Sequence, residues 1–208
     1  MADSDIDNRE ELERAFLIAR GAAINVYAIY ENSLAVLFSH LMGVQPEIGG
    51  IPFFRLNNAR ARMAILEKLL KKRHGDSYNI FWNSLVKNHV RPIDEQRNRI
   101  VHWVAAMQVR FENNHPLFTS INLIPPNYWD RVENSPSETI ASIDEFTAKC
   151  SFLAELISDF HRTLSDRENV DPSLREIFQK PIAYPPPDNH PTVQRLKGPG
   201  IRPRSSRA

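Results

Sequence analysis

From Leu12 to Leu41, an apolar residue recurs at every third or fourth position. This spacing lays one apolar stripe along a helix, so it predicts one long first helix, or two helices interrupted near Gly21. A membrane-spanning helix needs about 20 largely uninterrupted apolar residues. Polar residues such as Arg20 and Glu31 interrupt this stretch, so we expect a core helix and no membrane segment. The stripe consists of Leu12, Phe16, Ala19, Ala23, Val26, Tyr30, Leu34, Leu37 and Leu41.

The same spacing returns from Ile140 to Leu164 and predicts a long last helix, with Ser137 as its cap and Glu138 in its first turn. Glycines and a proline between Gly43 and Gly50 predict a loop after the first helix. A chain of 208 residues, 42% of them hydrophobic, can bury a substantial core. The patterns predict an all-α fold, a helical bundle with long first and last helices. Shorter helices are expected around Met63–Leu70 (capped by Asn57 or Asn58), around Ile80–Val86 (capped by Asp76), and over Ile93–Ala105 (after a break at Pro92).

Two segments after the last of these short helices alternate apolar and polar residues. They are Ala105–Phe111 and Leu117–Ile124, and the turn formers Asn113 and Asn114 lie between them. Alternation with a turn in the middle predicts a small β-hairpin. An extension of the preceding helix to Val109 is the alternative.

The composition changes after Gln179, where seven prolines oppose regular structure. We therefore expect residues 1–179 to form the helical domain and residues 180–208 to form a disordered Pro/Arg-rich tail. No acidic residue follows Asp188, so the end of the tail is basic. It is expected either to strengthen non-specific RNA binding by counterion release or to act as a solubilising or partner-binding extension.

The overall charge favours no class of partner, since 26 basic residues face 25 acidic ones. Only the segment from Arg55 to Arg73 stands out, with seven basic residues and one acid. It is a candidate for phosphate contact, or an ordinary solvated helix face.

The single cysteine, Cys150, excludes an intramolecular disulfide and suits a reducing cytoplasm. The acidic start of the chain lacks signal-peptide features, and the histidines show no metal-ligand spacing, so we expect a cytoplasmic protein with no metal or cofactor.

Arg97, Asn98 and His102 combine a permanent cation, an amide and an imidazole within six residues. An arginine followed by histidine at this distance arises by chance about twice in such a chain, so context must decide. The other match, Arg110 with His115, falls across the predicted hairpin turn. Arg97 lies on a helix that is apolar all round from Ile100 onward, so its charge needs a carboxylate or a phosphate as partner. The alternative is a buried Arg–Glu pair, with His102 as a hydrogen-bonded core residue.

The run from Arg97 to His102 resembles the motif of the HEPN superfamily, a group of helical-bundle proteins. Their signature is an arginine, usually a polar residue, and then a histidine on one of the later helices. The order of elements from Glu10 to Leu164 is also similar, including a first helix with the pair Tyr30-Glu31. From the residues alone, Glu31 is expected to pair with Arg97, to tune His102, or to lie at the helix edge.

The resemblance implies a metal-independent endoribonuclease of the toxin or phage-defence type. Such proteins act as homodimers, with the motifs of both chains meeting in one cleft. His102 would be the general acid or base, Arg97 would stabilise the transition state, and Asn98 would orient the phosphate or the imidazole. Many members of the superfamily are not catalytic. The alternative is therefore an RNA- or nucleotide-binding or dimerisation module that partners an antitoxin, a nucleotidyltransferase or another protein.

Overall fold

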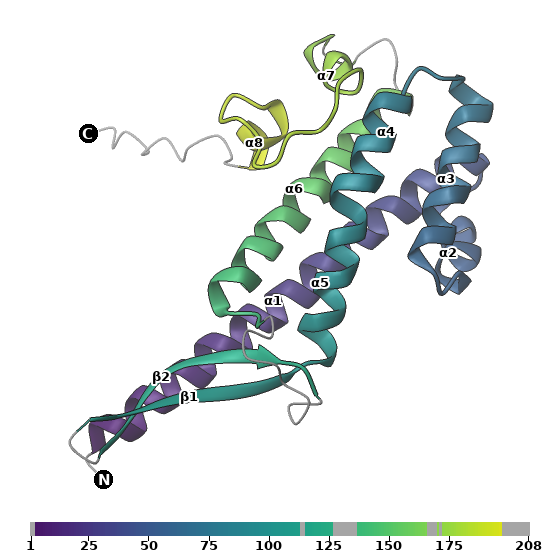
Figure 1. The fold of residues 1–208 in the computed structure, drawn as a ribbon. Coiled ribbons are helices and arrows are strands. Elements are labelled where there is room, and N and C mark those ends of the chain that lie inside the picture. Colours follow the sequence, from purple (N-terminus) through teal and green to yellow (C-terminus); the bar gives the residue numbers. More distant parts are fainter. Residues whose placement is uncertain (1–2, 113–114, 127–136, 166–169, 171, 197–208) are drawn as a thin grey trace, which may run out of the picture. The chain divides into compact units, whose positions relative to one another are not determined.

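The computed structural model describes residues 3–112, 115–126, 137–165, 170 and 172–196 (Figure 1). The chain divides into two compact units, one from residues 1–29 and 90–151 and the other from residues 30–89 and 152–208. Where it is described, the fold is mostly helical with one two-stranded antiparallel sheet. None of the helices in this part of the chain is long and apolar enough to cross a membrane. The elements are α1 (Asp3–Met42), α2 (Pro46–Arg55), α3 (Ala59–His74), α4 (Asn79–Leu85), the π-helix η1 (Val86–Val90), α5 (Arg91–His102), β1 (Val104–Glu112), β2 (His115–Ile124), α6 (Ile140–Ser165), α7 (Pro172–Ile177) and α8 (Pro191–Leu196).

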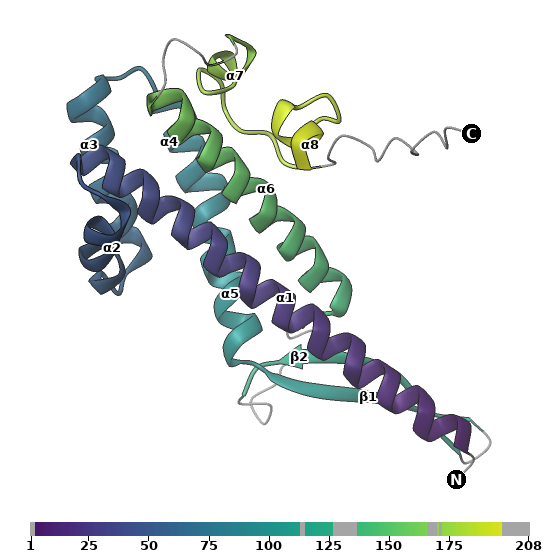
Figure 2. The same cartoon turned by 180° about the vertical axis from the view of Figure 1, so that it is seen from behind.

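The predicted β-hairpin is confirmed in unit 1, which is the part built from residues 1–29 and 90–151. β1 and β2 pair antiparallel along their length, with one bulge between Gln108 and Val109. The hairpin runs beside the first turns of α1 (Figure 2), where Asn8 Nδ2 donates to the carbonyl oxygen of Phe118 at 3.1 Å. The alternation of apolar and polar side chains therefore predicted the ends of both strands to within two residues.

The motif helix α5 is shorter than predicted. It ends at His102, and Trp103 already has extended backbone, with ψ at 152°. Val104 and Ala105 are exposed residues of β1 and do not continue the helix. The expectation of a helix buried on every side is therefore wrong, because its apolar run belongs half to a helix and half to a strand.

The motif helix begins within two residues of its predicted start, but the chain stays helical at Pro92, because α4, η1 and α5 follow one another without a gap. Proline lacks an N–H group, so it is tolerated in the first turn of a helix but not in its interior. Pro92 stands in the first turn of α5, and the five π-helical residues of η1 separate it from α4.

The first helix is continuous through Gly21 and ends at Gly43, whose φ of 73° is a conformation that favours glycine. The loop predicted after it is instead the helix α2. Gly49 of α2 packs directly on α1, because an added Cβ would lie 2.2 Å from Ser39 Oγ. Glycine thus serves here for the close packing of two helices, so the prediction of a loop from the glycines is wrong.

The last helix begins at Ile140, and its cap is not Ser137 as predicted. Thr139 and Ser142 cap it reciprocally, since the hydroxyl of each accepts the backbone N–H of the other at 2.9 and 3.1 Å. Glu138 lies before the helix and pairs by both backbone groups with Leu123 of β2. This pairing frees the Glu138 side chain for contacts with α5.

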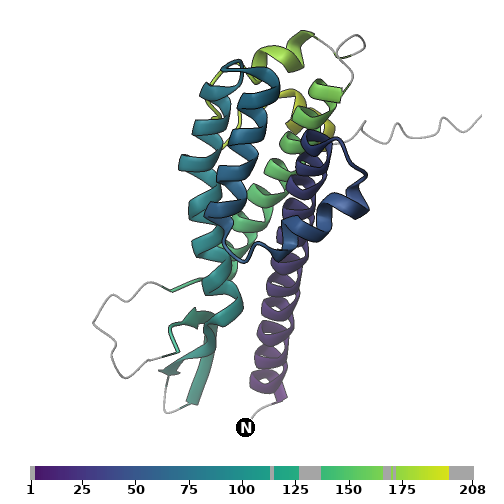
Figure 3. The ribbon, with the colours of Figure 1, turned by 90° about the vertical axis from the view of Figure 1, so that its right-hand side faces the viewer.

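Unit 2 is built from residues 30–89 and 152–208, as far as they are described. Figure 3 shows α3 and α4 side by side in it, joined by a short turn. Its core holds three phenylalanines, Phe81, Phe160 and Phe178, whose ring centroids lie 4.8–5.0 Å apart. Asn58 caps α3 by accepting the backbone N–H of Arg60 at 2.8 Å, as predicted.

The predicted disorder of the tail is not confirmed for residues 180–196; residues 197–208 lie outside the described part. The backbone N–H of Ile182 donates to Ser84 Oγ at 2.9 Å, and the ring of Tyr184 lies 5.9 Å from that of Phe152. Further along, Thr192 is buried. We call residues 178–196 the C-terminal strap. Proline prevents long helices here but does not prevent a segment from docking.

The strap is fixed at its end by a buried carboxylate. Asp159 of α6 is fully buried, and its Oδ2 accepts from Thr192 Oγ1 at 2.9 Å and pairs with Arg195. Its Oδ1 lies 3.6 Å from Arg162 Nη2. A buried carboxylate is stable only when its charge and its hydrogen bonds are compensated.

Replacing Arg195 should therefore destabilise unit 2. Removal of one partner of a buried ion pair costs about 3 kcal/mol or more. We expect Arg195→Ala to lower the free energy of unfolding by about that amount, measured by urea denaturation. Gln194→Ala, at an exposed position of the same short helix, is the matched control. Equal stability of the two variants would show that the strap is not anchored at Asp159.

Unit 2 should also lose stability in mild acid. Burial lowers the pKa of His190 below its usual 6.5, and His190 Nδ1 accepts the backbone N–H of Thr192 at 3.2 Å. The unfolded chain therefore binds this proton at a higher pH than the folded chain does. The contribution of His190 to stability is complete above about pH 6.5 and is lost as the pH falls through its folded pKa. Urea midpoints between about pH 7.5 and 5 should depend less on pH in His190→Gln than in the wild type. His115→Gln, at an exposed hairpin position, should keep the wild-type pH dependence.

Candidate functional site

The three motif residues lie in the second half of α5. Asn98 and His102 are exposed, and Arg97 is half-buried. Residues four apart share a helix face, so Asn98 and His102 point to the same side. The opposite side of the helix is fixed in the core by Ile93 and Ile100, each 1% exposed. The motif is thus presented at the surface of unit 1 by a helix with one buried face.

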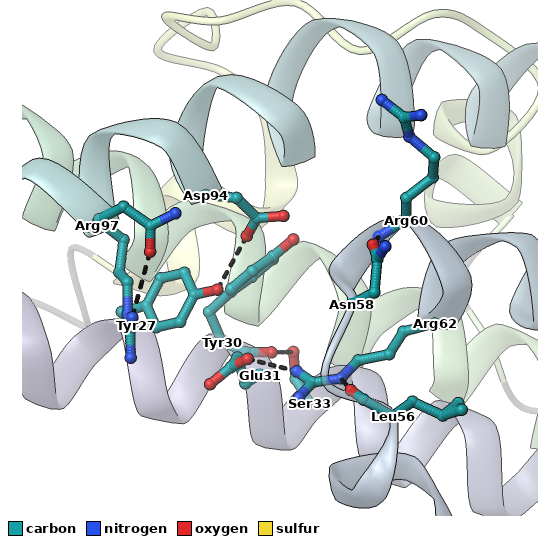
Figure 4. Close-up of polar contacts among 11 residues, drawn as sticks. Tyr27, Tyr30, Glu31, Ser33, Leu56, Asn58, Arg60, Arg62, Asp94 and Arg97 are labelled. Carbon is teal, nitrogen blue, oxygen red and sulfur yellow. Dashed lines mark hydrogen bonds and ion pairs between the residues drawn. The ribbon is translucent and has the colours of Figure 1, made fainter.

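The contacts of Arg97 with other described residues are to an amide and an aromatic ring. Its Nη1 donates to Asn98 Oδ1 at 3.2 Å, and its guanidinium lies 5.4 Å from the centroid of the Tyr27 ring (Figure 4). Tyr27 is itself held by its hydroxyl, which donates to Asp94 Oδ1 at 2.8 Å. None of the ion pairs found in the described parts of the chain includes Arg97. Its positive charge is therefore positioned by an aromatic face and an amide, and it forms no ion pair with an acid of the described residues.

A buried carboxylate pairs with a different arginine of this helix, Arg99. Arg99 Nε donates to Glu138 Oε1 at 2.6 Å, and the Glu138 side chain is only 7% exposed. The other carboxylate oxygen accepts from Gln96 Nε2 at 3.0 Å and from Ser142 Oγ at 2.7 Å. The alternative in which Arg97 forms a buried Arg–Glu pair and His102 is a core residue is therefore wrong, because Arg99 forms that pair and His102 is exposed.

Arg20 of α1 holds the end of the motif helix. Its Nε donates to the carbonyl oxygen of Ile100 and its Nη2 to that of Val101, both at 2.9 Å, and Nη2 lies 3.4 Å from that of Trp103. The last carbonyls of a helix have no partners within it, and a cation there is favourable. Arg20 thus fixes the turn that carries His102.

Glu31 has a partner within its own unit. It pairs with Arg62 at 2.5 Å in unit 2, and Arg62 also donates to the carbonyl oxygen of Leu56 at 2.7 Å (Figure 4). The guanidinium of Arg62 is therefore occupied, and it is not available to contact phosphate together with the rest of the basic segment Arg55–Arg73. The other basic residues of that segment are exposed: Arg55, Arg60, Lys68, Lys71, Lys72 and Arg73.

Cys150 is a buried core residue. It is buried in α6, and burial raises the pKa of its thiol to about 12, so it is not a nucleophile. In the described residues, no three or more His, Cys, Asp or Glu side chains come together as a set of metal ligands. The groups at the motif that can carry chemistry are one imidazole, one guanidinium and one amide.

Comparison with known proteins gave no match to a family model, a curated protein or a solved structure. The resemblance to the HEPN superfamily therefore depends on the motif and the order of the helices, and it stays a prediction.

The site includes three residues that sequence reasoning missed, Arg20, Tyr27 and Glu138. Arg20 gave one usable signal, since a charged residue within an apolar helix usually has a partner. Tyr27 and Glu138 gave no such signal, because their roles depend on residues 67 and 39 positions away in the chain.

The two arginines should respond differently to replacement. Arg99→Ala leaves Glu138 buried without its cation, and we expect a loss of about 3 kcal/mol in the free energy of unfolding. Arg97→Ala removes a half-exposed cation–π contact and should cost about 1 kcal/mol or less. Thermal and urea unfolding of both variants tests this difference. A larger loss for Arg97→Ala would assign Arg97 a structural role instead.

Proposed function

We propose that this chain acts on RNA as a HEPN-like, metal-independent endoribonuclease, with Arg97, Asn98 and His102 at the reacting phosphate. The observation that carries the proposal is the environment of Arg97. Among the described residues, its guanidinium is held against Tyr27 and Asn98 without a carboxylate ion pair, and it lies five residues before the exposed His102 on the same helix. A positioned cation that is not neutralised favours an anionic ligand.

The proposed chemistry needs only these groups and the RNA. His102 removes the proton of a ribose 2′-hydroxyl, and the oxygen attacks the adjacent phosphorus. The bond from phosphorus to the 5′-oxygen breaks, and that oxygen takes up a proton. The products carry a 2′,3′-cyclic phosphate and a 5′-hydroxyl. Arg97 stabilises the charge that accumulates on the phosphoryl oxygens, and Asn98 orients the phosphate.

A homodimer would supply the second acid–base group. Each motif contains one imidazole, whereas the reaction moves one proton from the 2′-hydroxyl and one to the leaving oxygen. Exposed apolar residues of unit 1 support association with a second copy, because monomers rarely expose many large apolar side chains together. Leu17 and Ile18 on α1 are 65% and 62% exposed, and Phe111 on β1 is 72% exposed.

Cleavage of RNA in excess EDTA tests the proposal. The wild-type protein should release fragments that end in a 2′,3′-cyclic phosphate. His102→Ala and Arg97→Ala should lower the rate by about 10²–10⁴-fold each, the contribution expected of a general acid or base or of a charge stabiliser. His115→Ala and Arg91→Ala are matched controls, because they remove exposed residues of the same types in the hairpin and in α5.

The exposed apolar residues favour a second candidate, a non-catalytic module that binds RNA or a nucleotide and partners an antitoxin or nucleotidyltransferase. Folded, dimeric wild-type protein that binds RNA without cutting it would support this candidate and contradict the nuclease. Cleavage that persists in His102→Ala would contradict the assignment of the catalytic residue.

A further inference from the structure

Most of the basic residues between Arg55 and Arg73 lie on α3 in unit 2, outside the motif. The inner face of α3 is fixed in the core by Met63, Leu66 and Leu70, each at most 4% exposed. With 3.6 residues per turn, four exposed cations fall within about 120° of one another on the outer face. We call these cations the basic ridge, and they are Arg60, Lys68, Lys71 and Lys72.

The ridge is long and is not crowded by large side chains. Arg60 and Lys72 are 12 residues apart, a distance of about 18 Å along the helix axis. Between Arg60 and Lys68 on this face lies Ala64, which is small and exposed. Figure 4 shows the side chain of Arg60 pointing away from the pair of Arg62 and Glu31. The ridge therefore presents its cations to solvent along several turns of one helix.

The charges of the ridge are poorly balanced by acids of the described residues. Lys71 Nζ lies 3.3 Å from Asp76 Oδ1, but these two side chains are 67% and 71% exposed. None of the ion pairs in the part of the chain that the structure describes includes Arg60, Lys68 or Lys72. Lys68 lies three residues before Lys71 and four before Lys72, a spacing at which like charges destabilise a helix.

The stability of α3 does not account for the ridge. Lys71 and Lys72 stand in the last turn, where the partial negative charge of the helix end favours cations. Arg60 stands in the first turn, where a cation is unfavourable, and Lys68 lies outside both end turns. The only acid in the sequence of α3 is Glu67. A ligand with a row of negative charges would relieve the repulsion that the fold leaves in place.

We propose that the basic ridge of α3 binds the phosphate backbone of RNA. The ridge lies in unit 2, whereas Arg97 and His102 belong to unit 1. The inference rests on the proposed function for its ligand, RNA, but it does not require the RNA to be cut. Phosphate contacts position a nucleic acid without reading its sequence, and each contact releases counterions. Binding through the ridge is therefore independent of sequence and weakens steeply as salt is added.

Binding of a single-stranded 2′-O-methyl RNA to the full-length protein tests the ridge. Methylation blocks the hydroxyl that the proposed cleavage uses, so the affinity is measured without cutting. For single strands, the logarithm of the binding constant falls against the logarithm of salt concentration with a slope of about 0.7 per phosphate contact. Lys68→Gln should reduce this slope by about 0.7, and replacing all four ridge cations by glutamine should reduce it by nearly 3. Single-stranded DNA of the same length should show the same reductions, because the ridge contacts phosphates.

The matched control removes the same total charge from scattered exposed positions. It carries the substitutions Lys87→Gln, Arg110→Gln, Arg175→Gln and Lys180→Gln, and its slope should stay within about 0.7 of the wild-type value. An unchanged slope in the fourfold ridge variant, or an equal loss in the control, would overturn the proposal. Ridge-dependent binding of an unmethylated RNA that is not cut would support the ridge and contradict the nuclease. If the wild-type protein binds no RNA even at low salt, both proposals are wrong.

Discussion

The carboxylate of Glu138 is the contact on which the arrangement of unit 1 depends. A buried charge of this kind is costly unless several donors satisfy it. Its donors come from α5 and α6, and its own backbone pairs with β2, so one residue joins three elements that are far apart in sequence. The orientation of the motif helix follows from this junction, together with the Arg20 contacts at the end of that helix. The contacts of Glu138 are with Gln96, Arg99, Ser142 and the backbone of Leu123.

Arg97 and Arg99 show how a helix gives two similar side chains different environments. Two residues apart on a helix, they point in nearly opposite directions. Arg99 faces Glu138 and is used for stability, whereas Arg97 faces Tyr27 and forms no ion pair with an acid in the part of the chain that the structure describes. If the proposed function holds, this separation lets the helix be firmly anchored without using the group that must meet the phosphate.

Local patterns in the sequence predicted the parts of the fold that depend on neighbouring residues. These include the long helices, the Asn58 cap, the start of the motif helix and the hairpin. Contacts between distant segments were not predictable in the same way. The glycines at positions 49 and 50 predicted a loop, because the close approach of Gly49 to Ser39 exists only in the folded protein. The prolines of the C-terminal strap predicted disorder, because amino-acid composition shows whether a segment can form helices or strands. It does not show whether an irregular segment packs against the rest of unit 2.

The positions of the candidate residues were predicted better than their surroundings. Arg97, Asn98 and His102 do share one helix, but the burial expected around them came from residues that belong to a strand. The pairing of Arg99 with Glu138 was not predicted, since Glu138 was expected inside the first turn of α6 and lies before it. An amphipathic pattern indicates which residues turn inward, but not which partner each of them meets.

Each compact unit is made of two segments separated by the other unit's residues. Neither can therefore form completely while the chain is still short during synthesis on the ribosome. Unit 1 needs residues near 150, and Asp159 gains its partners Thr192 and Arg195 only after residue 195 has emerged. Until then, the Asp159 carboxylate, which is buried in the folded protein, has to stay hydrated. Completion of the core of unit 2 therefore has to wait for a segment more than 30 residues further along the chain.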